Sequence, residues 1–315
     1  MLMFGFRLQR RAPRAFTPGA RTRRCGAFGP VRRFRDYVRI CALGLLLRGA
    51  AHASPGAVEL ETFAARDGNP SRSQAGSGVP AENIYGIGAS MLRTYLIDEH
   101  SGVLVRGSGA LLTHTAFAGL NELVLNANLR YRWQPAVGYT LPWYEVLIDV
   151  ERHKHANSTL RDAIGAALEL SVGKYFTDRV YATSGIGVRR TVADRGNVFD
   201  QTEAKAFATA AYRFGQEETF YARLSRTRGD RVFGADESYG MSGHVKAGDD
   251  DPVFGAGRYA YRMTATANVI EIGVDLPVRG HGAWDIGAKR ARAYADGGPA
   301  YGDNLILVSW RYRYY

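Results

Sequence analysis

The strongest structural signal in the chain lies in residues Asp303 to Tyr315, which read DNLILVSWRYRYY. Apolar and aromatic side chains take every second position, and the other positions end in two arginines. The first set is Ile306, Val308, Trp310, Tyr312 and Tyr314, and the second is Leu305, Leu307, Ser309, Arg311 and Arg313. Alternation with a period of two predicts a β-strand with one apolar and one mixed face. Such a strand suits a wall with lipid on one side and a polar lumen on the other. Because such a strand needs a partner on each edge, we expect a closed barrel.

This ending resembles the carboxy-terminal strand of bacterial outer-membrane β-barrels, which their assembly machinery reads as an insertion signal. The resemblance implies that Trp310, Tyr312, Tyr314 and Tyr315 form this signal. It also implies that the barrel-assembly machinery and periplasmic chaperones are partners. The alternating register runs only through Tyr314, so we expect Tyr315 to lie one residue beyond the strand.

The first 53 residues differ from the rest of the chain in charge. They contain 12 Arg, no Lys and one acidic residue, Asp36. The remaining chain has 29 basic and 29 acidic residues and is therefore neutral. Because the excess positive charge belongs to this leader, the high pI does not support a nucleic-acid partner, and we expect none.

Within the leader, the order of segments is typical of a secretory signal peptide. Arg32–Arg39 is a charged region, Ile40–Leu47 is a short apolar core, and Ala51–Ala53 supplies a small-x-small cleavage site. The apolar run is too short for a membrane-spanning helix, which needs about 20 residues. We therefore predict an Arg-rich leader plus cleavable signal peptide at 1–53 and a single domain at 54–315, secreted through the inner membrane.

Both cysteines, Cys25 and Cys41, precede the predicted cleavage site. The mature chain would have no cysteine, which excludes a disulfide framework, thiol catalysis and a cysteine-based metal site. The arginine-rich segment Met1–Pro30 is unusual in front of a signal peptide, and we expect translation to start nearer Val31 or Val38.

The mature chain is predicted to be all-β: a transmembrane antiparallel up-and-down β-barrel of about twelve strands. The alternation is clearest from residue 121 to residue 175 and weakest in the first strand. The predicted strands are Ala57–Arg66, Asn83–Leu96, Gly102–Thr113, Asn121–Trp133, Pro142–Lys154, Asp162–Tyr175, Arg179–Val192, Ala204–Phe214, Thr219–Thr227, Asn268–Leu276, His281–Ala293 and Asn304–Tyr315.

The lengths of the connections support this count. With both ends of the barrel chain in the periplasm, every second connection should be a short turn and the others longer external loops. The sequences IDEHSG, FTD, GQEE and PVRG fit the turns, and the run from Arg228 to Ala267 is the longest predicted external loop. An even strand number is also what single-chain bacterial barrels have.

The inward faces of these strands carry charges of both signs in equal number. One interpretation is a salt-bridged interior that stiffens the barrel, since unpaired charges in a narrow lumen are unfavourable. The other is a charged constriction in a pore for small polar solutes. The predicted lumen residues are Arg130, Arg132, Arg189, Arg223, Lys289, Arg311 and Arg313, with Glu145, Asp149, Glu151, Glu169, Glu271, Asp275 and Asp285.

One cluster leaves an enzymatic alternative open. Glu151, His153 and His155 share one face of a strand near its predicted external end, where two His and a carboxylate could hold a metal. With Ser158 they vaguely resemble the rim of the outer-membrane phospholipase, a twelve-stranded barrel with a Ser-His-Asn site. The Ser-Asn-Gly order around that nucleophile is absent here. A polar rim explains these residues otherwise, and we expect no metal and no cofactor.

Three phrases resemble a group of uncharacterised proteobacterial outer-membrane proteins: GYTLPWYE from Gly138, DDPVFGAGRYAYR from Asp250 and ADGGPAYGDNL from Ala295. The resemblance implies location and fold and brings no catalytic residues. Within the long loop we expect the run Asp249–Asp251 to be a solvated turn, although three acids could bind Ca²⁺ weakly. Arg258 and Tyr259 would tuck this loop into the lumen.

The sequence therefore predicts a non-enzymatic outer-membrane protein of a Gram-negative bacterium. It would be a narrow passive channel for small polar solutes, or a structural or surface barrel, surrounded by outer-membrane lipid and lipopolysaccharide. Two alternatives stay open. One is a lipid hydrolase using His153 or His155 with Ser158, and the other is a receptor or adhesin acting through the 228–267 loop.

Overall fold

The computed structural model describes one of the two units into which the chain divides, residues 1–48 and 49–315. All described residues belong to the second unit, and the predicted leader lies outside them. In this part of the chain, no helix is long and apolar enough to cross a membrane. The described residues are 56–74, 79–136, 138–236, 244–278 and 280–315.

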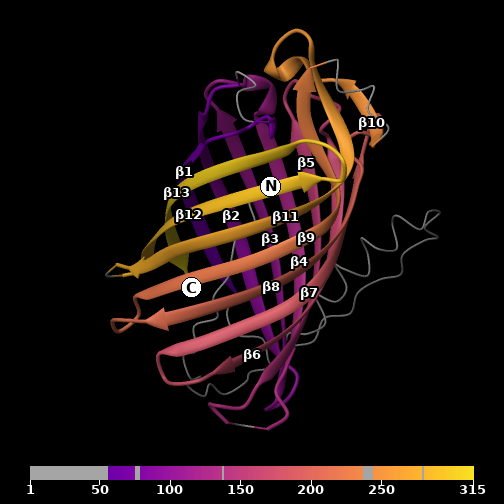
Figure 1. Ribbon diagram of the computed structural model, residues 1–315. Helices are drawn as coiled ribbons and strands as arrows, with labels where there is room; N and C mark the ends of the chain where they lie inside the picture. Colours follow the sequence, from indigo (N-terminus) through magenta and orange to yellow (C-terminus); the bar gives the residue numbers. More distant parts are fainter. Residues whose placement is uncertain (1–55, 75–78, 137, 237–243, 279) are drawn as a thin grey trace, which may run out of the picture. The chain divides into compact units, whose positions relative to one another are not determined.

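These residues form thirteen β-strands and two short 3₁₀ helices (Figure 1). Their bounds are β1 Ala57–Asp67, β2 Glu82–Leu96, β3 Ser101–His114, η1 Ala118–Leu120, β4 Glu122–Trp133, β5 Trp143–His155, β6 Ala163–Tyr175, β7 Val180–Ala193, β8 Gln201–Arg213, β9 Thr219–Asp236, β10 Val245–Asp250, η3 Pro252–Phe254, β11 Arg258–Pro277, β12 Gly282–Ala295 and β13 Ala300–Tyr314.

Twelve of the strands close into an antiparallel barrel. Each strand pairs with the next from β1 to β9, β9 then pairs with β11, and β12 and β13 follow. The wall closes because β13 pairs with β1, from Val58 opposite Tyr314 to Asp67 opposite Leu305. The predicted fold is confirmed, including the twelve-stranded wall. As the register implied, Tyr315 lies outside β13.

The outer wall is apolar because side chains alternate along every strand. In β4, Leu125 and Leu129 are exposed, whereas Asn126, Asn128 and Arg130 are partly buried between them. Exposed leucine, isoleucine and valine recur at outward positions of the other wall strands. An exposed apolar band around a closed sheet is the surface that faces lipid in transmembrane barrels.

Aromatic side chains gather at one end of the wall. We call the end with the connections 97–100, 134–142, 176–179, 214–218 and 278–281 the turn end, and the opposite end the loop end. At the turn end Trp133 stacks on Tyr144 with ring centroids 5.5 Å apart, and Trp284 lies 4.9 Å from Trp310. Aromatic girdles of this kind mark membrane–water interfaces, where one part of the ring is apolar and the other is wet.

The predicted long loop from Arg228 to Ala267 is wrong. β9 and β11 continue as paired strands from Thr227 opposite Ala267 to Asp236 opposite Arg258, and β10 adds to the free edge of β11. The sequence concealed these strands because the extension combines Arg, Gly and Ala with few large apolar residues. Without an apolar outward stripe, the period of two is not visible in the sequence.

Substitutions at two neighbouring residues of β4 test which face of the wall points to lipid and which to the lumen. We expect Leu129→Arg to reduce the free energy of unfolding by about 2–4 kcal/mol, the cost of an arginine on the lipid face. Asn128→Arg should cost much less, because Asn128 faces the lumen opposite Asp149. Urea unfolding of the refolded variants in phospholipid vesicles measures both values. Equal losses at the two positions would contradict the assignment of the faces.

Candidate functional site: a charged lumen with a covered mouth

One half of the inner wall carries a network of ion pairs on β4 to β8. The carboxylate of Glu145 forms ion pairs with two arginines, with N···O distances of 3.3 Å to Arg130 and 2.9 Å to Arg132. Arg189 donates two hydrogen bonds to Glu151, at 2.8 and 3.1 Å, and Asp149 lies 3.4 Å from the same guanidinium. Both signs are therefore paired on this side of the lumen.

The side chain of Glu151 reaches Arg189 by lying flat over the strand between them. Glu151 belongs to β5 and Arg189 to β7, and Gly165 of β6 separates them. A Cβ atom on Gly165 would lie 2.8 Å from the nearer carboxylate oxygen of Glu151. A glycine is required here because any side chain would occupy the space that the ion pair crosses.

The other half of the lumen carries a second network around the closing strands. Arg313 of β13 donates to Glu59 of β1 at 2.6 Å, and Arg106 of β3 lies 3.6 Å from the other oxygen of Glu59. Arg311 pairs with Asp275 and lies 3.7 Å from Asp285. Arg313 and Glu59 face each other on the adjacent strands β13 and β1, whereas the Arg106–Glu59 and Arg311–Asp275 pairs each span one intervening strand, so the network ties together neighbouring strands on both sides of the closure.

The remaining predicted lumen residues also occupy inward positions. Arg223, Glu271 and Lys289 are opposite one another on β9, β11 and β12. Arg223 additionally lies 5.0 Å from the ring centroid of Phe207. Glu169 pairs with Lys205 of β8.

Several lumen charges were missed from the sequence, and they belong to strands with weak alternation. Glu59 lies on β1, whose faces could not be assigned with certainty. Arg106 lies between Val105 and Gly107, and Lys205 lies between two alanines, so small residues interrupt the apolar stripe on the outward face. Counting every second residue from a well-defined position on the same strand would have found them.

Access to the lumen decreases from the turn end inward. The exposed fraction of the side chain is 32% for Arg132 and 18% for Arg130, which lies one step deeper on β4. It is 23% for Arg313 and 13% for Arg311 on β13. Arg189, beyond this level on β7, is only 8% exposed. The lumen is therefore more accessible to water at the turn end than at the buried charge pairs deeper in the barrel, a level that we call the waist.

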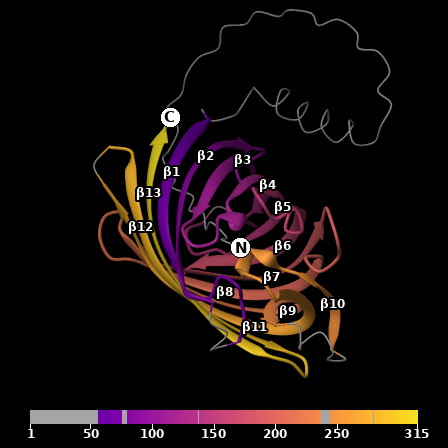
Figure 2. The same cartoon turned by 90° about the horizontal axis from the view of Figure 1, so that it is seen from above.

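At the loop end, residues 251–254 follow β10 and reach the opposite rim of the barrel; we call them the lid. Figure 2 shows the barrel from above, with the labels of β9, β10 and β11 on one side of the ring and those of β3 and β4 on another. The lid follows the β9–β11 extension, yet Phe254 packs on Phe117 with ring centroids 4.9 Å apart. Phe117 lies in the β3–β4 loop, six strands away in either direction around the twelve-stranded wall. Contact between opposite sides of the rim requires that the lid passes over the mouth.

The lid is held on the far side by one ion pair, which we call the latch. Arg161 in the β5–β6 loop donates two hydrogen bonds to the carboxylate of Asp251, one of 2.6 Å. The guanidinium also lies over the rings of Phe199 and Phe254, at 4.7 and 5.3 Å from their centroids. A bidentate pair between aromatic rings is strong and directional.

The latch corrects two expectations about this segment. The predicted solvated turn at Asp249–Asp251 is wrong for Asp251, which is 2% exposed because Arg161 and the lid cover it. Arg258 and Tyr259 do not tuck a loop into the lumen. They lie in β11, where their backbones pair with Asp236 and Ala235.

The β1–β2 loop covers a further part of the mouth. Ser73 forms an isolated parallel bridge with Gly234 of β9, and Asn69 donates a 2.8 Å hydrogen bond to the Ser73 carbonyl. Arg72 of this loop has a positive φ of 54°. Burial favours its neutral form, but Tyr301 and Asp303 outweigh burial and raise the pKa of Arg72 above its usual range. Its charge is therefore held against the inner wall at the loop end.

The residues of the hydrolase alternative do not form a catalytic arrangement. His153 lies between Glu122 at 3.0 Å and Glu151 at 3.1 Å. Ser158 is buried, and its hydroxyl accepts a 3.2 Å hydrogen bond from Arg161, with none joining it to His153 or His155. A nucleophile needs a base within hydrogen-bond reach. Across the described ranges, no three His, Cys, Asp or Glu residues are placed to hold a metal.

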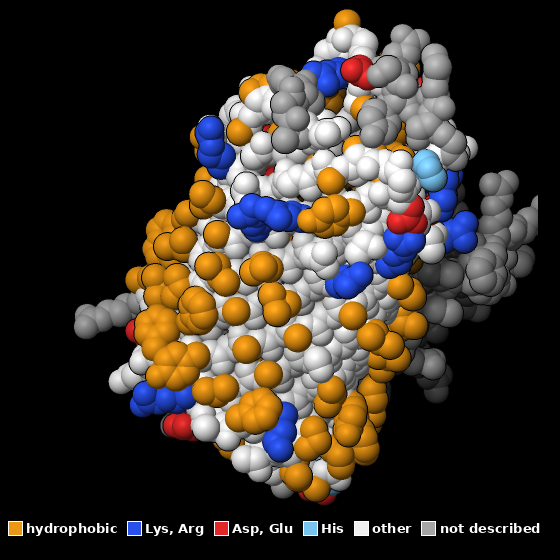
Figure 3. Space-filling model, in the orientation of Figure 1, with side chains coloured by type: hydrophobic (Ala, Val, Ile, Leu, Met, Phe, Trp, Pro, Cys, Tyr) orange, Lys and Arg blue, Asp and Glu red, His pale blue; other side chains and the backbone are white. Residues whose placement is uncertain are grey.

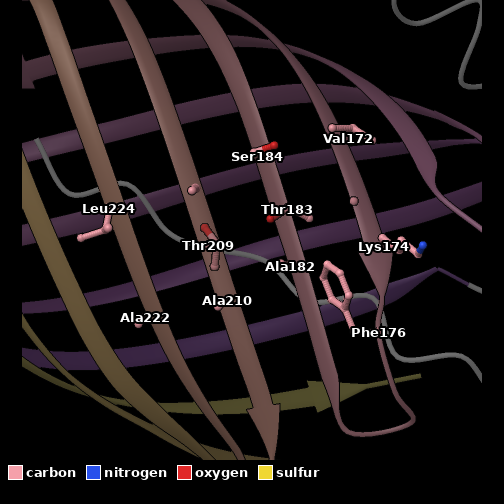
Figure 4. Close-up of a pocket in the computed structure, with 12 residues that line it drawn as sticks. Val172, Lys174, Phe176, Ala182, Thr183, Ser184, Thr209, Ala210, Ala222 and Leu224 are labelled. Atoms are coloured by element: carbon pink, nitrogen blue, oxygen red, sulfur yellow. The ribbon is translucent and has the colours of Figure 1, made fainter. Parts of the chain in front are cut away.

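A groove of about 390 Å³ lies on the outer wall near the turn end (Figure 4). Small outward side chains on β7 to β9 form its floor, and larger apolar side chains border it. It opens on the apolar face and takes no part in a path through the barrel. The floor residues are Ala182, Ser184, Ala208, Ala210 and Ala222, and the borders are Val172, Phe176 and Leu224.

The chain is similar in structure to an outer-membrane channel from Pseudomonas putida F1. The TM-score is 0.55 at 7% sequence identity, and the match covers 84% of this chain and 98% of that chain. The fold is therefore that of an outer-membrane β-barrel. No protein-family model and no curated protein matches the sequence.

Two other solved structures match at lower TM-scores. The translocator domain of the autotransporter NalP from Neisseria meningitidis has a TM-score of 0.41 at 12% identity, covering 89% of this chain and 95% of that chain. The KdgM porin in complex with disordered oligogalacturonate has a TM-score of 0.38 at 6% identity, covering 82% of this chain and 99% of that chain.

The buried pair at the waist should be essential to stability. We expect Arg189→Met to lower the free energy of unfolding by about 3–5 kcal/mol, because it leaves Glu151 buried without its main partner. The double variant Arg189→Met, Glu151→Leu should recover part of that loss, since the Glu151 carboxylate is then no longer buried without its main partner. Urea unfolding in detergent micelles provides the comparison. Additive losses in the double variant would contradict a coupled pair.

Proposed function

We propose that the protein is a narrow, gated passive channel for small polar solutes in the outer membrane. The observation that carries the proposal is the latched lid over a lumen that is water-accessible from the turn end. A barrel with a purely structural role needs no separate segment that crosses its mouth and is held by one ion pair. The similarity to an outer-membrane channel agrees with this proposal at the level of the fold.

The lining predicts weak selectivity between cations and anions. Carboxylates and guanidinium groups neutralise one another at several levels of the lumen, as at Glu151 with Arg189 and Glu59 with Arg313. A ring of one sign would exclude ions of the same sign. A balanced ring instead offers hydrogen-bond donors and acceptors to an uncharged polar solute or a zwitterion.

The lid gives the channel a closed arrangement. Its contacts on the far rim include the latch, the Phe117–Phe254 ring pair and the approach of Val253 to Gly119. A Cβ atom on Gly119 would lie 2.9 Å from a methyl group of Val253. Few contacts hold a lid of few residues, so the energy that separates the closed arrangement from an open one is small enough to be shifted by mutation.

Single-channel recording in planar bilayers tests the proposal. We expect Asp251→Ala to raise the open probability at least about tenfold, because loss of a buried bidentate pair removes more than the 1.4 kcal/mol that corresponds to this ratio. Gly119→Leu should act in the same direction without changing any charge, since the larger side chain displaces Val253. The wild-type protein should show rare, short openings.

Arg152→Ala is the matched control for these recordings. Arg152 forms a bidentate pair with Asp194 on the same rim, and this pair does not touch the lid. The control should conduct like the wild type. If neither the wild type nor the two lid variants conducts while all are folded, the channel function is wrong and the barrel is structural.

A further inference from the structure

Basic side chains gather on the outer wall at the loop end. Each of these side chains points outward, and each lies on its strand within five residues of the point where the wall ends at the loop end. The strands that carry them are β1, β5, β7, β9 and β12. The band consists of Arg66, Arg152, Lys154, Arg190, Arg226, Arg228, Arg290 and Arg292. Polar outward residues interrupt an apolar wall only at a cost, so a band of eight cations requires a partner of opposite charge.

Part of the band finds this partner within the protein. Arg152 pairs with Asp194, Lys154 with Asp162 and Arg228 with Asp296. These aspartates lie in the loops and the turn directly above the wall. The band is therefore neutralised where a carboxylate is within reach.

Three arginines on β9 and β12, the two strands that flank β11, lack such a partner. Among the described residues, no ion pair or hydrogen bond involves the side chain of Arg226, Arg290 or Arg292, and all three are exposed. Arg226 and Arg292 lie on either side of Asn268, with which both are in register. Their Cα atoms are about 10 Å apart, twice the strand spacing, and Arg290 lies about 7 Å below Arg292. We call these three residues the arginine triad.

The wall directly below the triad is apolar. Leu224 follows Arg226 toward the turn end, Ile270 and Ile272 follow Asn268, Ile286 lies below Arg290, and all are exposed. Figure 3 shows this face, with Lys and Arg side chains in a row across it and mostly hydrophobic side chains on the wall beneath. The surface is thus amphipathic along the barrel axis.

We propose that the arginine triad binds the phosphates of lipopolysaccharide, the phosphorylated and multiply acylated glycolipid of the outer leaflet. The inference rests on the outer-membrane location proposed above and deepens it. Loops are longer at this end of the barrel, which in outer-membrane barrels is the external side. The triad would then lie at the level of the lipid headgroups, and the apolar wall beneath it at the level of the acyl chains.

The chemistry of the site favours this occupant over a protein. Arginine forms paired hydrogen bonds to phosphate oxygens, and the low dielectric of the interface strengthens them. Three arginines whose Cα atoms lie within about 12 Å of one another can contact two phosphates at once. A water-soluble partner would also have to cover Leu224 and Ile270, which lie within the hydrocarbon in a membrane.

The test compares lipopolysaccharide binding by the refolded full chain and two triple variants in detergent micelles. We expect Arg226→Gln, Arg290→Gln, Arg292→Gln to weaken binding about tenfold or more, because charge-assisted contacts to phosphate are lost. The matched control, Arg93→Gln, Arg179→Gln, Arg213→Gln, removes the same charge at the turn end and should bind like the wild type. Electrophoretic mobility with and without heating confirms that each variant is folded.

The lipid is varied in the same assay. Dephosphorylated lipopolysaccharide should bind to the wild type as weakly as intact lipopolysaccharide binds to the triad variant, and phosphatidylcholine vesicles should show no difference between variants. Equal binding by wild type and triad variant, or equal binding of the dephosphorylated lipid, would overturn the proposed site. The result is independent of channel function, because the triad variant keeps its lumen and lid and should conduct like the wild type.

Discussion

The structure depends on one constraint: in hydrocarbon, every backbone N–H and C=O group must find its partner within the protein. The pairing of β1 with β13 satisfies the last two edges of the sheet. Once the wall is closed, the alternation of side chains determines what each residue can be. Outward residues are apolar over the height of the wall, and inward residues face one another across a narrow space. The interior therefore holds paired charges where a water-soluble protein of this size would have an apolar core.

The loop end has a different interior from the rest of the barrel. Phe233, Met263 and Tyr301 form a small buried apolar cluster there, beneath the extension of β9 and β11. This cluster supports the extension, and the extension carries the lid to the far rim. At the turn end, water reaches the side chains of Arg132 and Arg313. The two ends therefore differ in structure: the turn end admits water, and the loop end is packed and covered by the lid.

Most of the wall could be predicted from the sequence, because the bilayer imposes the pattern that the sequence displays. In β4 to β6 and β13, apolar or aromatic residues alternate with polar or charged residues, so the sequence shows which face of each strand points outward. The lid and the latch could not be predicted from the sequence. Arg161 and Asp251 are 90 residues apart, and nothing local distinguishes a buried Asp251 from its two neighbouring aspartates. The extension of β9 and β11 lies beyond the apolar band, where neither face of a strand has to be apolar.

The pair between Arg313 and Glu59 has a consequence for how the barrel is made. The two residues are 254 positions apart in sequence and belong to the two strands that meet last. An open sheet would leave Arg313 on one edge without Glu59, its partner in the closed wall. Closing the sheet forms this ion pair at the same moment as the final backbone hydrogen bonds. Because ion pairing and backbone pairing are completed together, closure is one cooperative event, and a half-closed barrel is unstable in lipid.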